Sequence, residues 1–182
     1  MKVLPTELEE ILIIQPSIFR DHRGIFIEVF KSVDFEKENI LNQFIQENQS
    51  GSKKGVLRGL HYQITRPQGK LVRVTYGQIF DVAVDIRQSS KTFGKWVGKI
   101  LSRENRLQMW VPPGFAHGFY TLSDWAEISY KLTDLYDPKG ERCIAWNDPE
   151  LKIDWHLHSG ETILLSQKDK DGKLLADADL FE

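Results

Sequence analysis

The sequence predicts an all-β protein, an antiparallel sandwich or barrel of which the jelly roll is one form. Three observations favour this class. Short segments in which apolar and polar residues alternate with a period of two dominate the chain and follow one another closely. Signals for helices are few, so we expect only a few short helices at the periphery. No internal repeat, low-complexity tract or linker divides the 182 residues, which predicts a single domain spanning residues 1–182.

The first expected strand lies at residues 11–14, where a mainly β-branched run suits a buried position. Residues 70–76 follow the alternating pattern, and their shared face begins with Lys70 and continues with two valines and a tyrosine. Gly77 and Gln78 then mark the turn that leads into the next strand.

Residues 79–86 show the clearest alternation, with apolar side chains on one face and Asp81 and Asp85 on the other. Residues 125–132 alternate in the same way and place Tyr130 on a face with apolar neighbours. A phenol on such a face needs a polar partner, so Tyr130 is a candidate for a role in a site.

Two short helices are expected outside these strands. Ser32 is placed to cap a helix that continues through residues 34–37. A second helix is expected around residues 149–151.

Composition and charge narrow the class of function. The chain is 41% hydrophobic, which suits a globular protein, and its net charge of −2 favours neither nucleic acid nor an acidic membrane as a partner. Cys143 is the only cysteine, so no intramolecular disulfide can form and a reducing compartment is expected. The N-terminus lacks the apolar core of a signal peptide, and no apolar run approaches the roughly 20 residues of a membrane span. We therefore expect a cytoplasmic protein.

Residues 55–63 and 112–118 carry the most informative pattern in the chain. They resemble the paired motifs of the cupin superfamily, G(x)5HxH(x)3–4E and PxGxxH, which implies a cupin-type double-stranded β-helix, or jelly roll. His61 stands at the first histidine, but Gln63 and Gln68 occupy the positions of the second histidine and the glutamate. Amides are poor ligands for a transition metal, so we expect no metal and a His61 that is free to act as a base.

A more specific resemblance covers nearly the whole chain, from about residue 14 to residue 169. Six strings occur in the order found in the dTDP-4-dehydrorhamnose 3,5-epimerase family: residues 19–24 followed by Glu28, then 46–50, 54–63, 68–72, 113–119 and 165–169. The resemblance implies a dimeric enzyme without a metal or organic cofactor. Its expected substrate is a dTDP-linked 4-keto-6-deoxy sugar, inverted at C3 and C5 on the way to dTDP-L-rhamnose.

The chemistry of such a substrate defines the catalytic groups. The C–H bonds at C3 and C5 flank the carbonyl, so inversion requires a base, an acid on the opposite face and a donor at the enolate oxygen. The resemblance implies that His61 is the base, Asp169 its orienting carboxylate, Tyr130 the acid and Lys70 the donor. Each also has an ordinary interpretation: a core histidine, a solvated turn carboxylate, a core tyrosine and a lysine reaching solvent.

The strand around His61 poses a geometric problem. In a regular strand His61 and Gly59 share one face, so Arg58 points to the other face. Because the resemblance places Arg58 in the same pocket as His61, we expect a bulge near Gly59 or a bend in this strand.

The resemblance also implies binding roles. Cations suit the diphosphate, amides the nucleoside and an aromatic ring the thymine, for which Tyr136 is the expected ring. The expected binding residues are Phe19, Arg23, Glu28, Gln46, Asn48, Arg58, His117, Tyr136, Glu141 and Lys168. His117, at the last ligand position of the cupin motif, is expected to bind the sugar or a phosphate. No role is expected for His22, His156 and His158.

The family dimer exchanges N-terminal strands, so Arg23 and Glu28 are expected to serve the partner's pocket. Three alternatives remain open for the function. A related enzyme inverts only C3 or only C5, because the shape of the pocket decides whether the second proton is presented. The others are a metal-dependent cupin and a non-catalytic cupin that binds sugar nucleotides.

Overall fold

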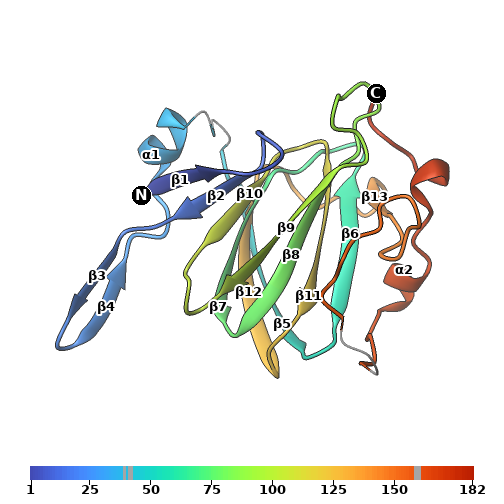
Figure 1. Cartoon of the computed structure of the whole chain (residues 1–182). Helices are drawn as coiled ribbons and strands as arrows, with labels where there is room; N and C mark the ends of the chain where they lie inside the picture. The colour runs from blue at the N-terminus through green and yellow to red at the C-terminus, as the bar shows by residue number, and fades with distance from the viewer. Residues whose placement is uncertain (39, 41–42, 158–160) are drawn as a thin grey trace.

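Two antiparallel sheets packed face to face form the body of the protein (Figure 1). The computed structural model describes residues 1–38, 40, 43–157 and 161–182. One sheet has the order β1 (Lys2–Pro5), β2 (Leu12–Gln15), β10 (Gln108–Val111), β7 (Lys70–Tyr76), β12 (Trp125–Leu132) and β5 (Gln46–Lys53). The other has the order β13 (Glu141–Cys143), β6 (Leu57–Gln63), β11 (Phe115–Thr121), β8 (Gln78–Asp85) and β9 (Trp96–Ser102). The predicted all-β jelly roll is confirmed.

Apolar side chains from both sheets meet in the space between them. This core includes Val72 and Ile128 from the first sheet and Ile79, Ala83 and Phe119 from the second, all nearly inaccessible to solvent. The expected alternation in β12 is confirmed, since Ala126, Ile128 and Leu132 are buried on the face that also carries Tyr130.

Both faces of the second sheet are buried. Phe80, Val82 and Val84 of β8 pack on the outer side against the C-terminal part of the chain, including Trp155 and Leu175. Asp81 and Asp85 lie on the opposite face, as the alternation predicted, but this face is the inner side of the sandwich, and both residues are 0% exposed. Because a buried carboxylate is costly without hydrogen-bond partners, we expect each of these two aspartates to have specific polar neighbours.

The turn at Gly77 and Gln78 differs from an ordinary hairpin. It does not pair the strands that it joins, because β7 belongs to one sheet and β8 to the other. Gly77 has φ +72° there, a left-handed conformation that glycine adopts readily. The turn therefore carries the chain across the sandwich.

The helices are short, as expected, but their positions differ in part from the prediction. Helix α1 (Ser32–Lys37) is capped by Lys31 without a side-chain bond, so Ser32 is its first residue and not its cap. Residues 149–151 form turns and not a helix. The other helical segments are α2 (Gln167–Lys170) and the 3₁₀ helix η1 (Leu175–Asp177). No helix in the described ranges is long and apolar enough to cross a membrane.

A separate hairpin, β3 (Ile18–Asp21) and β4 (Gly24–Ile27), projects away from both sheets (Figure 1). Its aromatic side chains pack mainly on each other: the ring centroids of Phe19 and Phe26 are 6.3 Å apart, and the two residues are 61% and 68% exposed. An exposed aromatic hairpin of this kind is unusual on the surface of an isolated chain.

Candidate active site

A cavity of about 480 Å³ opens between the two sheets. Its lining comes from five strands of the two sheets, β5, β6, β7, β11 and β12. The loop that follows β12, the edge strand β13 and the helix α2 each add further side chains. Most of the side chains predicted from the sequence are among them: Gln46, Asn48, Arg58, His61, Lys70, His117, Tyr130, Tyr136, Glu141 and Lys168. The cavity therefore collects groups that are separated by more than one hundred residues in the sequence.

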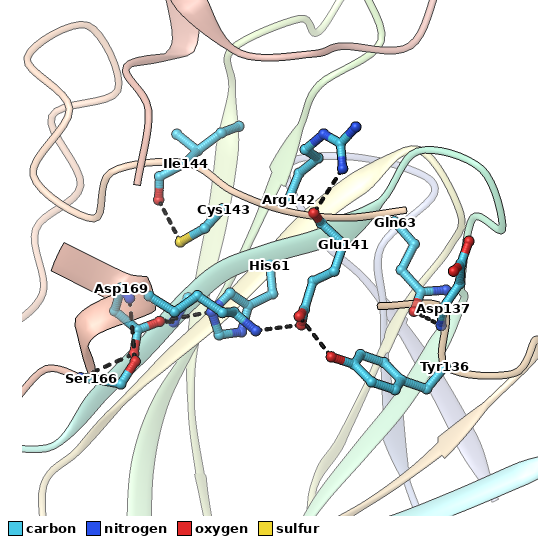
Figure 2. Close-up of polar contacts among 12 residues, drawn as sticks. His61, Gln63, Tyr136, Asp137, Glu141, Arg142, Cys143, Ile144, Ser166 and Asp169 are labelled. Atoms are coloured by element: carbon cyan, nitrogen blue, oxygen red, sulfur yellow. Dashed lines mark hydrogen bonds and ion pairs between the residues drawn. The ribbon is translucent and has the colours of Figure 1, made fainter. Parts of the chain in front are cut away.

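His61 and Asp169 form a hydrogen-bonded pair in the wall of this cavity (Figure 2). The distance between His61 Nε2 and Asp169 Oδ1 is 2.7 Å, and Asp169 is only 3% exposed. Asp169 is the third residue of α2, and its Oδ2 accepts a hydrogen bond of 2.5 Å from Ser166 Oγ at the helix cap. The sequence left two interpretations of Asp169, a carboxylate that orients His61 or a solvated charge in a turn. The structure buries this carboxylate against His61.

The surroundings set the protonation of this pair. Burial raises the pKa of Asp169, but hydrogen bonds from His61, Ser166 and the Gly59 N–H outweigh it and hold that pKa below its usual value. Burial lowers the pKa of His61, against the opposing effect of Asp169. Near neutral pH the pair therefore holds an ionised carboxylate and a neutral imidazole whose Nε2 carries the proton toward Asp169.

A bulge in β6 brings Arg58 to the same cavity. On β11, His117 lies opposite His61 but Phe119 lies opposite Arg58, so β6 contains one extra residue between these two pairs. Gly59 sits in this bulge with φ +116°, and a Cβ there would lie 2.5 Å from Gly118 Cα. The expected bulge near Gly59 is confirmed, and only glycine suits both the backbone angle and the close approach.

Lys70 and His117 lie deeper in the cavity. Lys70 is 9% exposed, and its Nζ donates a hydrogen bond of 3.1 Å to the carbonyl oxygen of His61. Burial lowers the pKa of Lys70 to about 8, while Asp81 and Glu141 act in the opposite direction. Its ammonium is therefore the majority form at neutral pH but loses its proton under mildly basic conditions.

Asp81 is a functional candidate that sequence reasoning missed. Its Oδ1 lies 2.8 Å from His117 Nε2, and its Oδ2 has no hydrogen-bond partner within the described part of the chain. The sequence placed Asp81 opposite the apolar face of its strand, but it gave no sign that His117 would lie beside it. His117, which lines the cavity, thus belongs to a second His–Asp pair, and the buried Asp81 of this pair raises the pKa of Lys70.

Tyr130 enters the cavity from the sheet opposite to that of His61. It lies on β12, between Asn48 of β5 and Val72 of β7, whereas His61 lies on β6 of the other sheet. The imidazole of His61 and the phenol of Tyr130 therefore line one cavity from different sheets.

Glu141 connects two more of the predicted binding residues. Its Oε2 accepts a hydrogen bond of 2.8 Å from Tyr136 Oη (Figure 2), and its Oε1 forms a close ion pair with Lys168. Burial raises the pKa of Glu141, but the bonds from Lys168 and Tyr136 lower it below its ordinary value. Tyr136 is 51% exposed, so its ring remains accessible from the cavity.

The N-terminal binding residues do not reach this cavity within one chain. Phe19 and Arg23 line a separate hollow of about 280 Å³ on the projecting hairpin, and Arg23 pairs with Asp21. Glu28 follows that hairpin and lines neither hollow. The single chain therefore leaves these three side chains apart from the other predicted binding residues.

The described residues offer one cluster with the atoms to hold a metal ion. The ligand atoms of His61, Cys143 and Asp169 lie within 4.8 Å of one another. However, His61 and Asp169 already bond to each other, and burial raises the pKa of Cys143 to about 12, which favours the protonated thiol. Gln63 and Gln68, at the ligand positions of the cupin motif, direct their amides to main-chain groups.

His22 and His156 lie away from this chemistry. His22 is exposed in the projecting hairpin, and His156 packs edge-on against Phe80 with centroids 4.4 Å apart. His158 lies outside the described residues.

Comparison with known proteins gives consistent matches over the whole chain. The profile of the dTDP-4-dehydrorhamnose 3,5-epimerase family matches residues 5–177. A Pseudomonas aeruginosa dTDP-4-dehydrorhamnose 3,5-epimerase is 54% identical over 182 residues, which cover 100% of this chain and 99% of that protein.

Solved structures give the same result. The Legionella pneumophila epimerase RmlC in complex with dTDP-4-keto-L-rhamnose superimposes with a TM-score of 0.95 at 52% identity, over 98% of this chain and 94% of that one. ChmJ, a 3'-monoepimerase from Streptomyces bikiniensis in complex with dTDP-quinovose, has a TM-score of 0.86 at 30% identity, over 94% and 87% of the two chains.

Proposed function

This chain belongs to the dTDP-4-dehydrorhamnose 3,5-epimerase family, and we propose that it inverts C3 and C5 of dTDP-4-dehydro-6-deoxy-D-glucose to give dTDP-4-dehydro-L-rhamnose. The resemblance predicted from the sequence is confirmed, and the protein is an isomerase. The observation that carries the proposed reaction is the opposed placement of His61 and Tyr130, on different sheets but around one cavity.

Proton removal is assigned to His61. Its Nε2 bonds to the ionised Asp169, which leaves Nδ1 as the ring nitrogen with a free lone pair. When Nδ1 takes the proton from C3 or C5, the adjacent carboxylate stabilises the imidazolium that forms. A base positioned in this way contributes roughly 10²- to 10⁴-fold to the rate.

The negative charge that develops on O4 requires a donor. The Lys70 ammonium lies in the cavity beside the strand that carries His61, and His117 lines the same region. A positioned donor of this kind contributes about 3 kcal/mol to an enolate-like transition state. Tyr130 Oη then donates a proton to the carbon from the opposite face, which inverts the centre.

The nucleotide is assigned to the polar side of the cavity. Arg58 and Lys168 supply positive charge for the diphosphate, and the half-exposed ring of Tyr136 supplies a stacking surface for thymine. Gln46 and Asn48, bonded to each other at 3.0 Å, supply amide groups for the nucleoside. The dTDP-4-keto-L-rhamnose in the Legionella RmlC complex supports a ligand of this class.

The assembly that we propose is a homodimer in which the β3–β4 hairpin of each chain reaches the pocket of the other. The exposed Phe19 and Phe26 and the distance of Arg23 from its own cavity support this exchange. In this arrangement Phe19, Arg23 and Glu28 complete the partner's nucleotide site. We further propose one domain over residues 1–182, a cytoplasmic location, reaction without a metal or organic cofactor, and no nucleic-acid or membrane partner.

Proton NMR tests the reaction. The metal-stripped protein is incubated in D₂O with dTDP-4-dehydro-6-deoxy-D-glucose, and we expect deuterium at both C3 and C5, with an L-rhamnose product after reduction by a partner reductase. Exchange at only one carbon would identify a mono-epimerase, which the likeness to ChmJ makes the second candidate. Absence of exchange at both carbons would contradict the proposed function.

A further inference from the structure

Gln63 makes an unusual set of contacts at the edge of the cavity. It is the last residue of β6 and is only 3% exposed, although it lies two residues after His61. Its Nε2 donates to the carbonyl oxygens of Arg66 (2.8 Å) and Leu135 (3.2 Å), and its Oε1 accepts from the Asp137 N–H (2.8 Å). One side-chain amide therefore holds the main chain on both sides of Tyr136.

Other glutamines hold the same loop. The carbonyl oxygen of Asp134 accepts a bond of 2.8 Å from Gln68 Nε2, and the Tyr136 N–H donates a bond of 3.0 Å to Gln46 Oε1. The loop is thus fixed through its main chain, while the ring of Tyr136 stays half exposed at the cavity with its hydroxyl on Glu141. Figure 2 shows Gln63 and Asp137 close to Tyr136, with the bond between the Gln63 amide and the Asp137 N–H.

The three bonds of Gln63 require an amide. A carboxylate has no hydrogen to donate to the Arg66 and Leu135 carbonyls, and an imidazole cannot reproduce two donations from one atom and an acceptance at another. The same position in the cupin motif would hold a metal-binding histidine. A side chain that could bind metal is thus replaced by one that fixes a loop.

We propose that Gln63 is a positioning residue for nucleotide recognition, which holds Tyr136 at the angle required to stack on the base. This inference rests on the proposed function, because it needs a nucleotide against Tyr136. It predicts a separation of roles along one strand: His61 acts on the sugar, and Gln63, two residues later, acts on the base through the loop.

The first test is the Gln63→Glu variant, which keeps the size of the side chain and removes both donations. We expect KM for the dTDP-sugar and the Kd for dTDP to rise roughly tenfold, because base–aromatic stacking has about that effect. We expect kcat to change by less than about twofold, since the base and acid are untouched. Gln63→Met removes both donations and also the acceptor of the Asp137 N–H, without a buried charge, and should give the same pattern if the charged variant folds poorly.

A matched control comes from Asn105, whose amide also holds a turn through the main chain, with bonds to Ser102, Leu107 and Ile100. It lies away from the cavity, so Asn105→Asp should leave both KM and Kd at their original values. An equal loss of affinity in this control would show that any damaged loop weakens binding, and would overturn the proposal.

A double-mutant cycle with Tyr136→Ala completes the test. If Gln63 acts through Tyr136, the variant with both changes should bind dTDP no more weakly than Tyr136→Ala alone. Additive losses would overturn the positioning role while leaving the proposed function in place. If the unaltered protein neither exchanges deuterium nor binds dTDP, both the proposed function and this inference fail.

Discussion

His61 shows how neighbouring groups tune one side chain. Burial lowers its pKa, and the nearby Lys168 and Lys70 act in the same direction, while Asp169 raises it. The balance leaves a neutral imidazole at neutral pH, which is the form that can take a proton. When His61 takes up a proton, Asp169 stabilises the imidazolium that forms, whereas Lys168 and Lys70 destabilise it.

Paired variants separate the roles of base and acid. His61→Ala should abolish deuterium exchange at C3 and C5 and leave dTDP binding nearly unchanged, because the nucleotide contacts lie elsewhere. Tyr130→Phe should retain some exchange and lose net inversion, since the base alone can remove and return a proton on one face. NMR of exchange and product, with calorimetry of dTDP binding, measures both. Strong residual exchange in the first variant, or normal inversion in the second, would reassign these residues.

The pH dependence of kcat/KM reports on the protonation of His61 and Lys70, and a variant of Asp81 tests the basic limb. The acid limb of kcat/KM should lie below the ordinary pKa of histidine, because activity needs neutral His61 and the pKa of His61 is lowered. The basic limb should lie near pH 8, where Lys70 loses its proton. Asp81→Asn removes a charge that raises the pKa of Lys70, so the basic limb should move to lower pH. A basic limb that stays in place in this variant would show that Asp81 does not raise the pKa of Lys70.

Strand β6 shows why an element cannot be described by its average geometry. A regular strand would turn Arg58 away from His61, and the bulge at Gly59 brings both to one cavity. The N–H of Gly59 also donates a bond of 3.0 Å to Asp169 Oδ1. The irregular residue thus contributes to both the shape and the electrostatics of the site.

Gly59→Ala tests this element. Its Cβ would lie 2.5 Å from Gly118 Cα in a left-handed backbone conformation, so we expect a loss of about 1–3 kcal/mol in the free energy of unfolding and a larger loss of activity. Gly94→Ala is the control: Gly94 also has positive φ (+72°), but the nearest atom to its Cβ would be 3.8 Å away. Urea denaturation of both variants measures the difference. Equal stability would show that the close approach at Gly59 is unimportant.

The elements also show what the sequence could predict. Alternation located β8 and β12 and placed Tyr130 on the inner face, because the period of a strand is a local property. It did not locate α2, although Ser166 and Asp169 have the spacing of a capping box. The pairing of Asp169 with His61 spans 108 residues, and that of Asp81 with His117 spans 36, so no local pattern reveals them. The first was predicted only by resemblance to a family, and the second was missed.

At the scale of the whole molecule, the proposed exchange of hairpins can be tested by complementation. Chains with Arg23→Ala and chains with His61→Ala are unfolded, mixed and refolded together. If Arg23 serves the partner's pocket, each mixed dimer has one pocket with both an intact His61 and an intact Arg23, and activity should reappear. Each variant refolded alone is the control. If the mixture is no more active than the separate variants, Arg23 serves its own chain.

The capping box of α2 has a consequence for the synthesis of the chain. Every strand of the two sheets precedes residue 144, but Asp169 joins His61 only when the segment after the sheets has docked. On the ribosome, a growing chain can therefore assemble its sandwich before its base is fully oriented. The epimerase becomes competent late, after residues 166–170 have left the exit tunnel and the helix capped by Ser166 has formed.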